Sequence, residues 1–107
     1  MKIRGRHKTR EVLIDGVRLD PTDSQQIYNH SPGGFSWGST GSGCSQLALA
    51  LMLRFAGSAR IAQRLYRDFM VEIIQHIPAD ADFELDAELI TDWIGERRPR
   101  LEWAEKF

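Results

Sequence analysis

The apolar positions near the start of the chain come in short runs that suit β-strands. Residues 11–14 and 17–19 are two such runs, and Asp15-Gly16 lies between them. Asp-Gly at this place favours a type I′ turn, because both central residues of that turn need a positive φ angle. We therefore expect an N-terminal β-hairpin within residues 1–20, with a first strand that reaches back toward Ile3.

Residues 21–43 show no regular pattern and are rich in turn-forming residues. Pro21, Pro32 and several glycines punctuate the segment, which also carries Phe35 and Trp37. A connection of this length is uncommon in a compact domain unless it is functional or packs on itself. The aromatic residues predict an aromatic, glycine-rich loop that packs.

Apolar residues then recur with helical spacing, which predicts a first helix over residues 43–57. Ser42 suits the N-cap, and Gly57 stands where a left-handed C-cap residue is needed. The stretch 47–53 is apolar on every face, which is typical of a helix that is buried all round.

Two further helices are expected. Ser58 can cap a second one, over residues 58–77, whose apolar stripe recurs about every four residues. Phe83 and Leu85 predict a short extended segment. Asp86 would then cap a third helix over residues 86–95, with Gly95 and Pro99 marking its end and Trp103 docking from the tail. The fold class is therefore α+β, with three packed helices and a single domain over 1–107.

Composition agrees with one globular domain and excludes several classes of protein. The 107 residues are 42% hydrophobic and 27% charged, with a single cysteine that cannot form an internal disulfide. No apolar run approaches the roughly 18 residues of a membrane span, and no apolar segment follows the basic start. A cytoplasmic location without membrane contact is expected.

Charge is distributed unevenly along the chain, although the net charge is only −1. Residues 1–10 contain five bases and no acid, at alternate positions that an extended chain would place on one face. Residues 80–92 contain six acids and no base. The two segments allow internal or intermolecular pairing, a basic face directed at an anion, or simply two solvated faces. The negative total argues against a dedicated nucleic-acid binder.

The glycine-rich turn over residues 37–46 is the first candidate site. Glycines let other groups approach the backbone, and the N-terminus of a helix favours phosphate or carboxylate. The predicted donors are Gly41, Ser42, Gly43, Cys44, Ser45 and Gln46; Trp37 or Phe35 would form an apolar wall, Arg4 or Arg6 a counter-charge, and His30 could face the turn. The alternative is that the glycines only let a buried helix pack tightly.

Known phosphate-binding motifs and catalytic groups are not indicated. The turn lacks a Gly-Lys-Ser/Thr ending, and no βαβ unit surrounds it. The three histidines and one cysteine lack the spacing of metal ligands, so neither a metal nor a cofactor is expected. No spacing fixes a catalytic triad, and we expect the protein not to be an enzyme.

The chain resembles a small family of proteins that carry a domain of unknown function and occur in prokaryotic, plasmid and phage genomes. Residues 34–50 match its segment of the type GFxWGxxGSGxxQLALA. The other matching positions are Arg4-Gly5-Arg6, Val12–Gly16, Asn29-His30-Ser31-Pro32, Tyr66, Phe69, Ile77-Pro78, Ile90 and Trp93. Ser39 and Cys44 replace a usual tyrosine and proline. The resemblance implies a shared fold and site location, and a role in conflict between phage and host.

These observations lead to two expected functions. The first is a non-enzymatic binding protein that holds a small phosphorylated or nucleotide-like ligand at the glycine-rich helix N-terminus, and in a phage sequesters a defence signal. The second is a protein-interaction module, an inhibitor or adaptor, that contacts a host or phage protein through its basic N-terminal strand or its acidic segment 80–92. An exposed hairpin edge would also allow homodimerisation.

Overall fold

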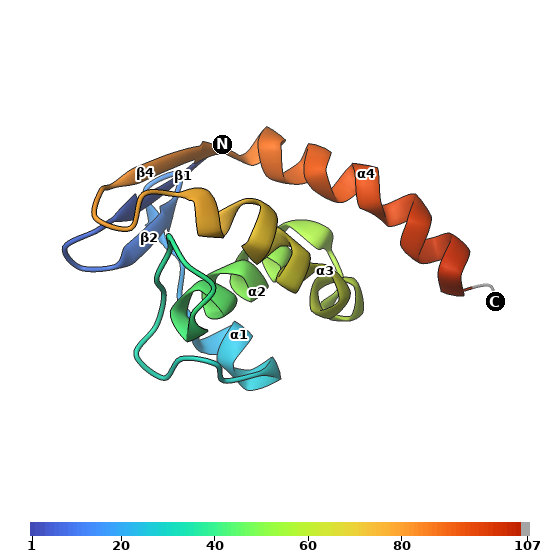
Figure 1. Ribbon diagram of the computed structural model, residues 1–107, viewed down its shortest axis with the longest axis horizontal. Helices are drawn as coiled ribbons and strands as arrows, with labels where there is room; N and C mark the ends of the chain where they lie inside the picture. Colours follow the sequence, from blue (N-terminus) through green and yellow to red (C-terminus); the bar gives the residue numbers. More distant parts are fainter. Residues whose placement is uncertain (106–107) are drawn as a thin grey trace.

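The computed structural model describes the backbone of residues 1–105 and the side chains of residues 1–97. Figure 1 shows a small sheet at one end of the molecule, a group of helices beside it, and a long last helix that leaves directly from a strand. The expected α+β class with packed helices is confirmed.

The sheet has four antiparallel strands in the order β3-β2-β1-β4. Their bounds are β1 Lys2–Arg6, β2 Glu11–Ile14, β3 Val17–Arg18 and β4 Phe83–Asp86. Asp15 and Gly16, between β2 and β3, have φ angles of 49° and 80°. The predicted turn and the extended segment at Phe83 are confirmed. The first strand of this hairpin does not reach back to Ile3 as predicted, because residues 2–6 form a separate strand, β1.

The pairing of β1 with β4 joins the first strand of the chain to the strand that precedes α4. Cross-strand neighbours are Lys2 with Asp86 and Arg4 with Glu84. A Cβ atom on Gly5 would lie 2.0 Å from the ring of Phe83, so only glycine lets this ring cross the strand. Sequence periodicity carries no information about such a long-range pairing.

A short helix, α1 (Thr22–Ile27), interrupts the segment that was predicted to be a continuous loop. The carboxylate of Asp20 accepts hydrogen bonds from the Thr22 backbone N–H at 2.9 Å and from its hydroxyl at 2.6 Å. These bonds satisfy groups at the start of the helix, and they lower the pKa of Asp20. The loop prediction was therefore wrong over residues 22–27.

The central helix α2 spans Ser42–Ala56. Gly41 is its N-cap residue and Ser42 is already helical, so the prediction of a Ser42 cap was wrong by one position. Gly57 ends the helix with a φ of 76°, as predicted. Residues 47–52 are all buried, because α2 packs along the next helix and also contacts α1 and α4.

The helix α3 spans Ala59–Glu72 and is capped by Ser58, whose hydroxyl accepts a bond from the Ile61 N–H at 3.4 Å. It ends earlier than predicted, because the backbone departs from helical geometry at Ile73. A 3₁₀ turn, η1 (Ile74–His76), follows. There the carbonyl of Ile74 accepts a bond from Gly38, which ties the glycine-rich segment to the end of α3.

The last helix α4 spans Ala87–Glu105 and passes through both predicted end points. Asp86 is the last residue of β4 and lies directly before the first residue of α4, the position at which the cap was predicted. Gly95 adopts no positive φ angle and does not end the helix. The side chain of Trp103 lies outside the described residues.

One cluster of buried residues connects the sheet with the helices. Its largest fully buried apolar members come from every layer: Trp37, Phe69, Ile3, Leu47, Leu49, Leu51, Met52, Ile74 and Ile90. In the described part of the chain, no helix is both long enough and apolar enough to cross a membrane.

Candidate functional site

The glycines of the predicted cradle make close packing contacts. A Cβ atom on Gly38 would lie 2.5 Å from the Ala79 side chain, and one on Gly43 would lie 2.7 Å from the Ser36 side chain. The Gly43 carbonyl also accepts a hydrogen bond from the Ser36 N–H at 3.1 Å. These contacts favour the structural interpretation of the turn, with the loop and the segment after η1 as its neighbours.

The side chains that follow in α2 point inward. Cys44 is 1% exposed and its sulfur lies 3.3 Å from the Ser39 hydroxyl. The Ser45 hydroxyl donates to the sulfur of Met70, and the Ser45 N–H bonds the Gly41 carbonyl within the first turn of the helix. Among the predicted donors at residues 41–46, only Gly41 and Ser42 are exposed.

Gln46 is fully buried and joins three segments of the protein. Its carbonyl oxygen accepts the backbone N–H groups of His30 and Ser31 at 2.8 and 3.0 Å. Its amide nitrogen donates to the Ser24 hydroxyl and to the Tyr28 carbonyl. All the polar capacity of this amide is therefore used in fixing the loop after α1.

Trp37 belongs to the core, with 1% of its surface exposed. Its indole N–H donates to the Ala81 carbonyl, and its ring packs edge-on against Phe83. The Arg10 guanidinium lies 4.6 Å from the ring centre and donates to the Ala79 carbonyl at 2.7 Å. Trp37 thus has no free face for a ligand, and Arg10 locks the turn between β1 and β2 onto the loop.

His30 lies between two tyrosines. Its ring stacks on Tyr28 with centroids 4.1 Å apart, and its Nε2 atom is 2.9 Å from the Tyr66 hydroxyl. Partial burial lowers the pKa of His30, and the positive charge of Arg67 lowers it further. The neutral ring therefore fixes the start of the loop, as Gln46 does.

Arg4 and Arg6 lie on the exposed face of the sheet. Arg4 forms an ion pair with Glu84 at 3.5 Å, while Lys2 pairs with Glu84 and Asp86. The hydrogen bond from Lys2 lowers the pKa of Asp86. Arg4, Arg6 and Glu84 line a hollow of about 350 Å³, and none of residues 35–46 lines it. The basic strand and the acidic segment thus meet each other, which is the internal pairing that the sequence allowed.

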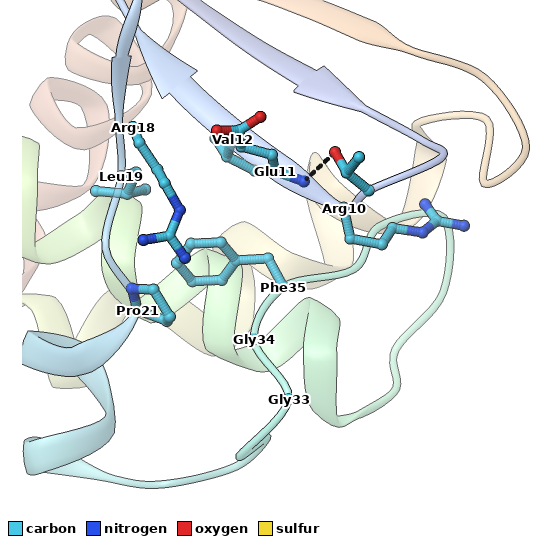
Figure 2. Close-up of a pocket in the computed structure, with 10 residues that line it drawn as sticks. Arg10, Glu11, Val12, Arg18, Leu19, Pro21, Gly33, Gly34 and Phe35 are labelled. Carbon is cyan, nitrogen blue, oxygen red and sulfur yellow. Dashed lines mark hydrogen bonds between the residues drawn. The ribbon is translucent and has the colours of Figure 1, made fainter.

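A different hollow, of about 270 Å³, opens where β3 diverges from β2 and where the loop passes beneath them (Figure 2). We call it the Arg18 hollow. It is lined by Thr9, Arg10, Glu11, Val12, Arg18, Leu19, Pro21, Gly33, Gly34 and Phe35. Phe35 is the one residue of the predicted site that lines it.

The guanidinium of Arg18 extends toward the ring of Phe35 in Figure 2. Among the side chains that the structure describes, no carboxylate forms an ion pair with it. Asp20 is its nearest electrostatic partner, but that carboxylate is already held by Thr22. Glu11 also lines the hollow, and the register of β2 with β3 places its side chain on the same face as Leu13 and Arg18, yet no ion pair joins Glu11 to Arg18 among the described side chains. Arg18 is therefore an available cation.

The opposite wall of the hollow is held rigidly. The Gln25 amide donates to the Ser31 carbonyl at 2.8 Å, and Gln46 binds the N–H groups just before it. Gly34 has a φ of 107°, and a Cβ atom on either Gly33 or Gly34 would meet only open space. The two glycines thus keep this wall thin and its backbone accessible.

Sequence reasoning missed Arg18, Gly33 and Gly34. The available signal was the pair of adjacent glycines just before Phe35, together with a charged residue on a very short strand. Neither feature shows that the two segments meet. No group of histidine, cysteine, aspartate or glutamate within the described residues is arranged to hold a metal ion.

Residues 3–96 match the model of a family described as a family of unknown function, DUF6166. The match covers most of the chain, so the chain belongs to this family, and the resemblance to a family with a domain of unknown function is confirmed. No curated protein and no solved structure matches the chain.

Proposed function

We propose that this member of DUF6166 is a non-enzymatic binding protein that holds a small anionic ligand in the Arg18 hollow. One observation carries the proposal: the guanidinium of Arg18, which has no ion-pair partner among the described side chains, extends toward the buried ring of Phe35 in a hollow of about 270 Å³. An arginine fork suits carboxylate and phosphate groups, and the ring of Phe35 with Leu19 gives the ligand an apolar contact.

The size of the hollow limits the ligand. Ligand sites commonly have volumes of about 300–1,000 Å³, and this one lies just below that range. A ligand with one phosphate or carboxylate and a small apolar or planar part fits better than a dinucleotide. The proposal still includes binding of a nucleotide-like signal and its sequestration in a phage, with the ligand limited to this smaller size.

The packing of residues 37–46 supports a site outside the glycine-rich turn. Cys44 and Gln46 are buried, and Gly43 is pressed against the loop. We therefore propose that the glycine-rich turn supports the loop and that the ligand binds on the loop's other side. In this proposal, the residues predicted as donors at 41–46 hold the loop in position and do not contact the ligand.

A matched pair of variants at Gly33 tests the proposal. Gly33→Leu should fill the hollow and weaken binding of phenyl phosphate or benzoate by more than tenfold, whereas Gly33→Ala should bind as the wild type does. Arg18→Gln should weaken binding by about 10- to 100-fold, as expected for a hydrogen bond to a charged group. Isothermal titration calorimetry measures each affinity, and urea unfolding checks each fold.

Equal binding by the wild type and Gly33→Leu would place the ligand elsewhere. If neither probe nor inorganic phosphate binds the wild type, the proposal fails.

A further inference from the structure

β3 is an edge strand, and its backbone is open on one side. The Leu19 N–H bonds the Val12 carbonyl at 2.7 Å, and Leu13 pairs with Arg18 in the next register position. Hydrogen-bonded and non-bonded pairs alternate in an antiparallel ladder, so the pair Leu13–Arg18 is non-bonded. The N–H and C=O groups of Arg18 therefore point away from β2, toward the open edge.

A second hollow, of about 300 Å³, lies along this edge on the side that faces α2. We call it the β3 edge hollow. Its apolar lining includes Ile14, Leu19 and two unusually exposed side chains, Val17 at 71% and Met1 at 58%. Val17 is next to Arg18 and points to the opposite face of the sheet. A strand added to the edge would thus cover Val17 with its own alternate side chains.

The charges around the edge favour an acidic partner. Arg18 and Arg54 both line the β3 edge hollow, and neither forms an ion pair among the described side chains. Asp15 lines it too, but its carboxylate accepts the Lys2 N–H at 2.8 Å. The adjoining hollow of about 240 Å³ contains Asp20 and Asp23 beside Arg54 and would repel an acid.

We propose that an extended peptide segment of a partner protein adds to β3 as a fifth strand, with an acidic residue opposite Arg18 and an apolar neighbour in the β3 edge hollow. Main-chain bonds to Arg18 set the register, and alternate side chains provide the specificity. A second copy of this chain fits less well, because two-fold pairing of the edges would place Arg18 opposite Arg18. The proposal does not depend on the Arg18 hollow.

The probe is an acetylated, amidated and fluorescently labelled pentapeptide in which glutamate alternates with isoleucine. Its control has the same composition, with the three glutamates together. Fluorescence anisotropy should show saturable binding of the alternating peptide only, and hydrogen exchange of the Arg18 amide should slow when it binds. Val17→Asp should abolish the binding, because it places a like charge beside the peptide's acids.

Two substitutions at Arg18 separate its charge from its backbone. Arg18→Ala keeps the outward N–H, whereas Arg18→Pro removes it at an edge position where proline is tolerated. The proline variant should bind the peptide about 2- to 10-fold more weakly than the alanine variant, the value of one net hydrogen bond. If Arg18→Pro does not fold, a peptide N-methylated at its central glutamate should show the same loss against the wild type.

Equal binding by Arg18→Ala and Arg18→Pro, or by the two peptides, would overturn the inference. A stable wild-type dimer in size-exclusion chromatography that Arg18→Pro dissociates would assign the edge to a second copy and would also overturn it. Phenyl phosphate is titrated in parallel. If the protein binds phenyl phosphate but not the alternating peptide, the proposed function stands and this inference fails. If it binds the peptide but not phenyl phosphate, only the proposed function fails.

Discussion

Gln46 shows how a single residue can be placed correctly and interpreted wrongly from sequence. It follows the glycine-rich turn, where an amide is a plausible ligand donor. The structure buries it and uses both ends of its amide inside the protein. Periodicity marks the residue as helical, but burial depends on a loop that packs over it from another part of the chain.

Gln46→Ala should destabilise the fold by about 2–4 kcal/mol, because it removes the four hydrogen bonds of a fully buried amide, two of them from the backbone N–H groups of His30 and Ser31. Urea unfolding measures the loss. Gln63→Ala removes an exposed amide that bonds only its own helix, and it should change stability by no more than about 0.5 kcal/mol. Similar losses for the two variants would show that Gln46 does not hold the loop.

His30 should make stability depend on pH. Its pKa is lower in the folded protein than the ordinary value of 6.5, because of burial and then Arg67. At a pH well above 6.5 the His30 ring is neutral in both the folded and the unfolded protein, so it does not reduce stability. As the pH falls below 6.5, the unfolded chain takes up more protons, so stability falls until the folded pKa is passed. Urea unfolding across this range should show the decrease in the wild type.

The variant His30→Gln is the control for this dependence, because a glutamine keeps a polar group near the Tyr66 hydroxyl without titrating. Its stability should fall less than that of the wild type between pH 7 and pH 5. Parallel pH profiles for the two proteins would rule out His30 as the titrating group.

At the scale of elements, the sequence correctly predicted turns and helix ends that depend on one or two neighbouring residues. The Asp15-Gly16 turn, the Ser58 cap and the Gly57 C-cap all have fixed backbone requirements, and all three are found. The helix α1 was missed because Pro21 precedes it within a turn-rich segment, and the long α4 because Gly95 reads as an end signal. The pairing of β4 with β1 required knowledge that Phe83 crosses Gly5.

The glycine-rich segment should respond to alanine in a position-specific way. Gly38 has a φ of 88° and touches the backbone of Ala79, so Gly38→Ala should cost about 1–3 kcal/mol. Gly33 has open space around it, so Gly33→Ala should stay within about 0.5 kcal/mol of the wild type. Thermal unfolding compares them. A tolerated Gly38→Ala would contradict the view that this segment is packed for structural reasons.

At the scale of the whole molecule, the N-terminal strand β1 pairs with β4 at one edge of the sheet, and the short strand β3 forms the other edge. Part of the opposite charge of residues 1–10 and 80–92 is used in pairing β1 with β4, where Lys2 and Arg4 form ion pairs with acids of β4. The unpaired arginine and the thin glycine wall occur instead at the other edge, where β3 is short. The sequence could predict an anion site near the aromatic loop, but its position depends on how the loop passes the sheet.

The most direct measurement is a titration with phenyl phosphate followed by amide chemical shifts in two-dimensional NMR, because it locates the ligand residue by residue. The account predicts the largest shifts at residues 9–12, 18–19 and 33–35, around the Arg18 hollow. Residues 41–46 should move little. Shifts concentrated at Gly41 to Gln46, with residues 18 and 33–35 unchanged, would contradict the account and return the site to the helix N-terminus.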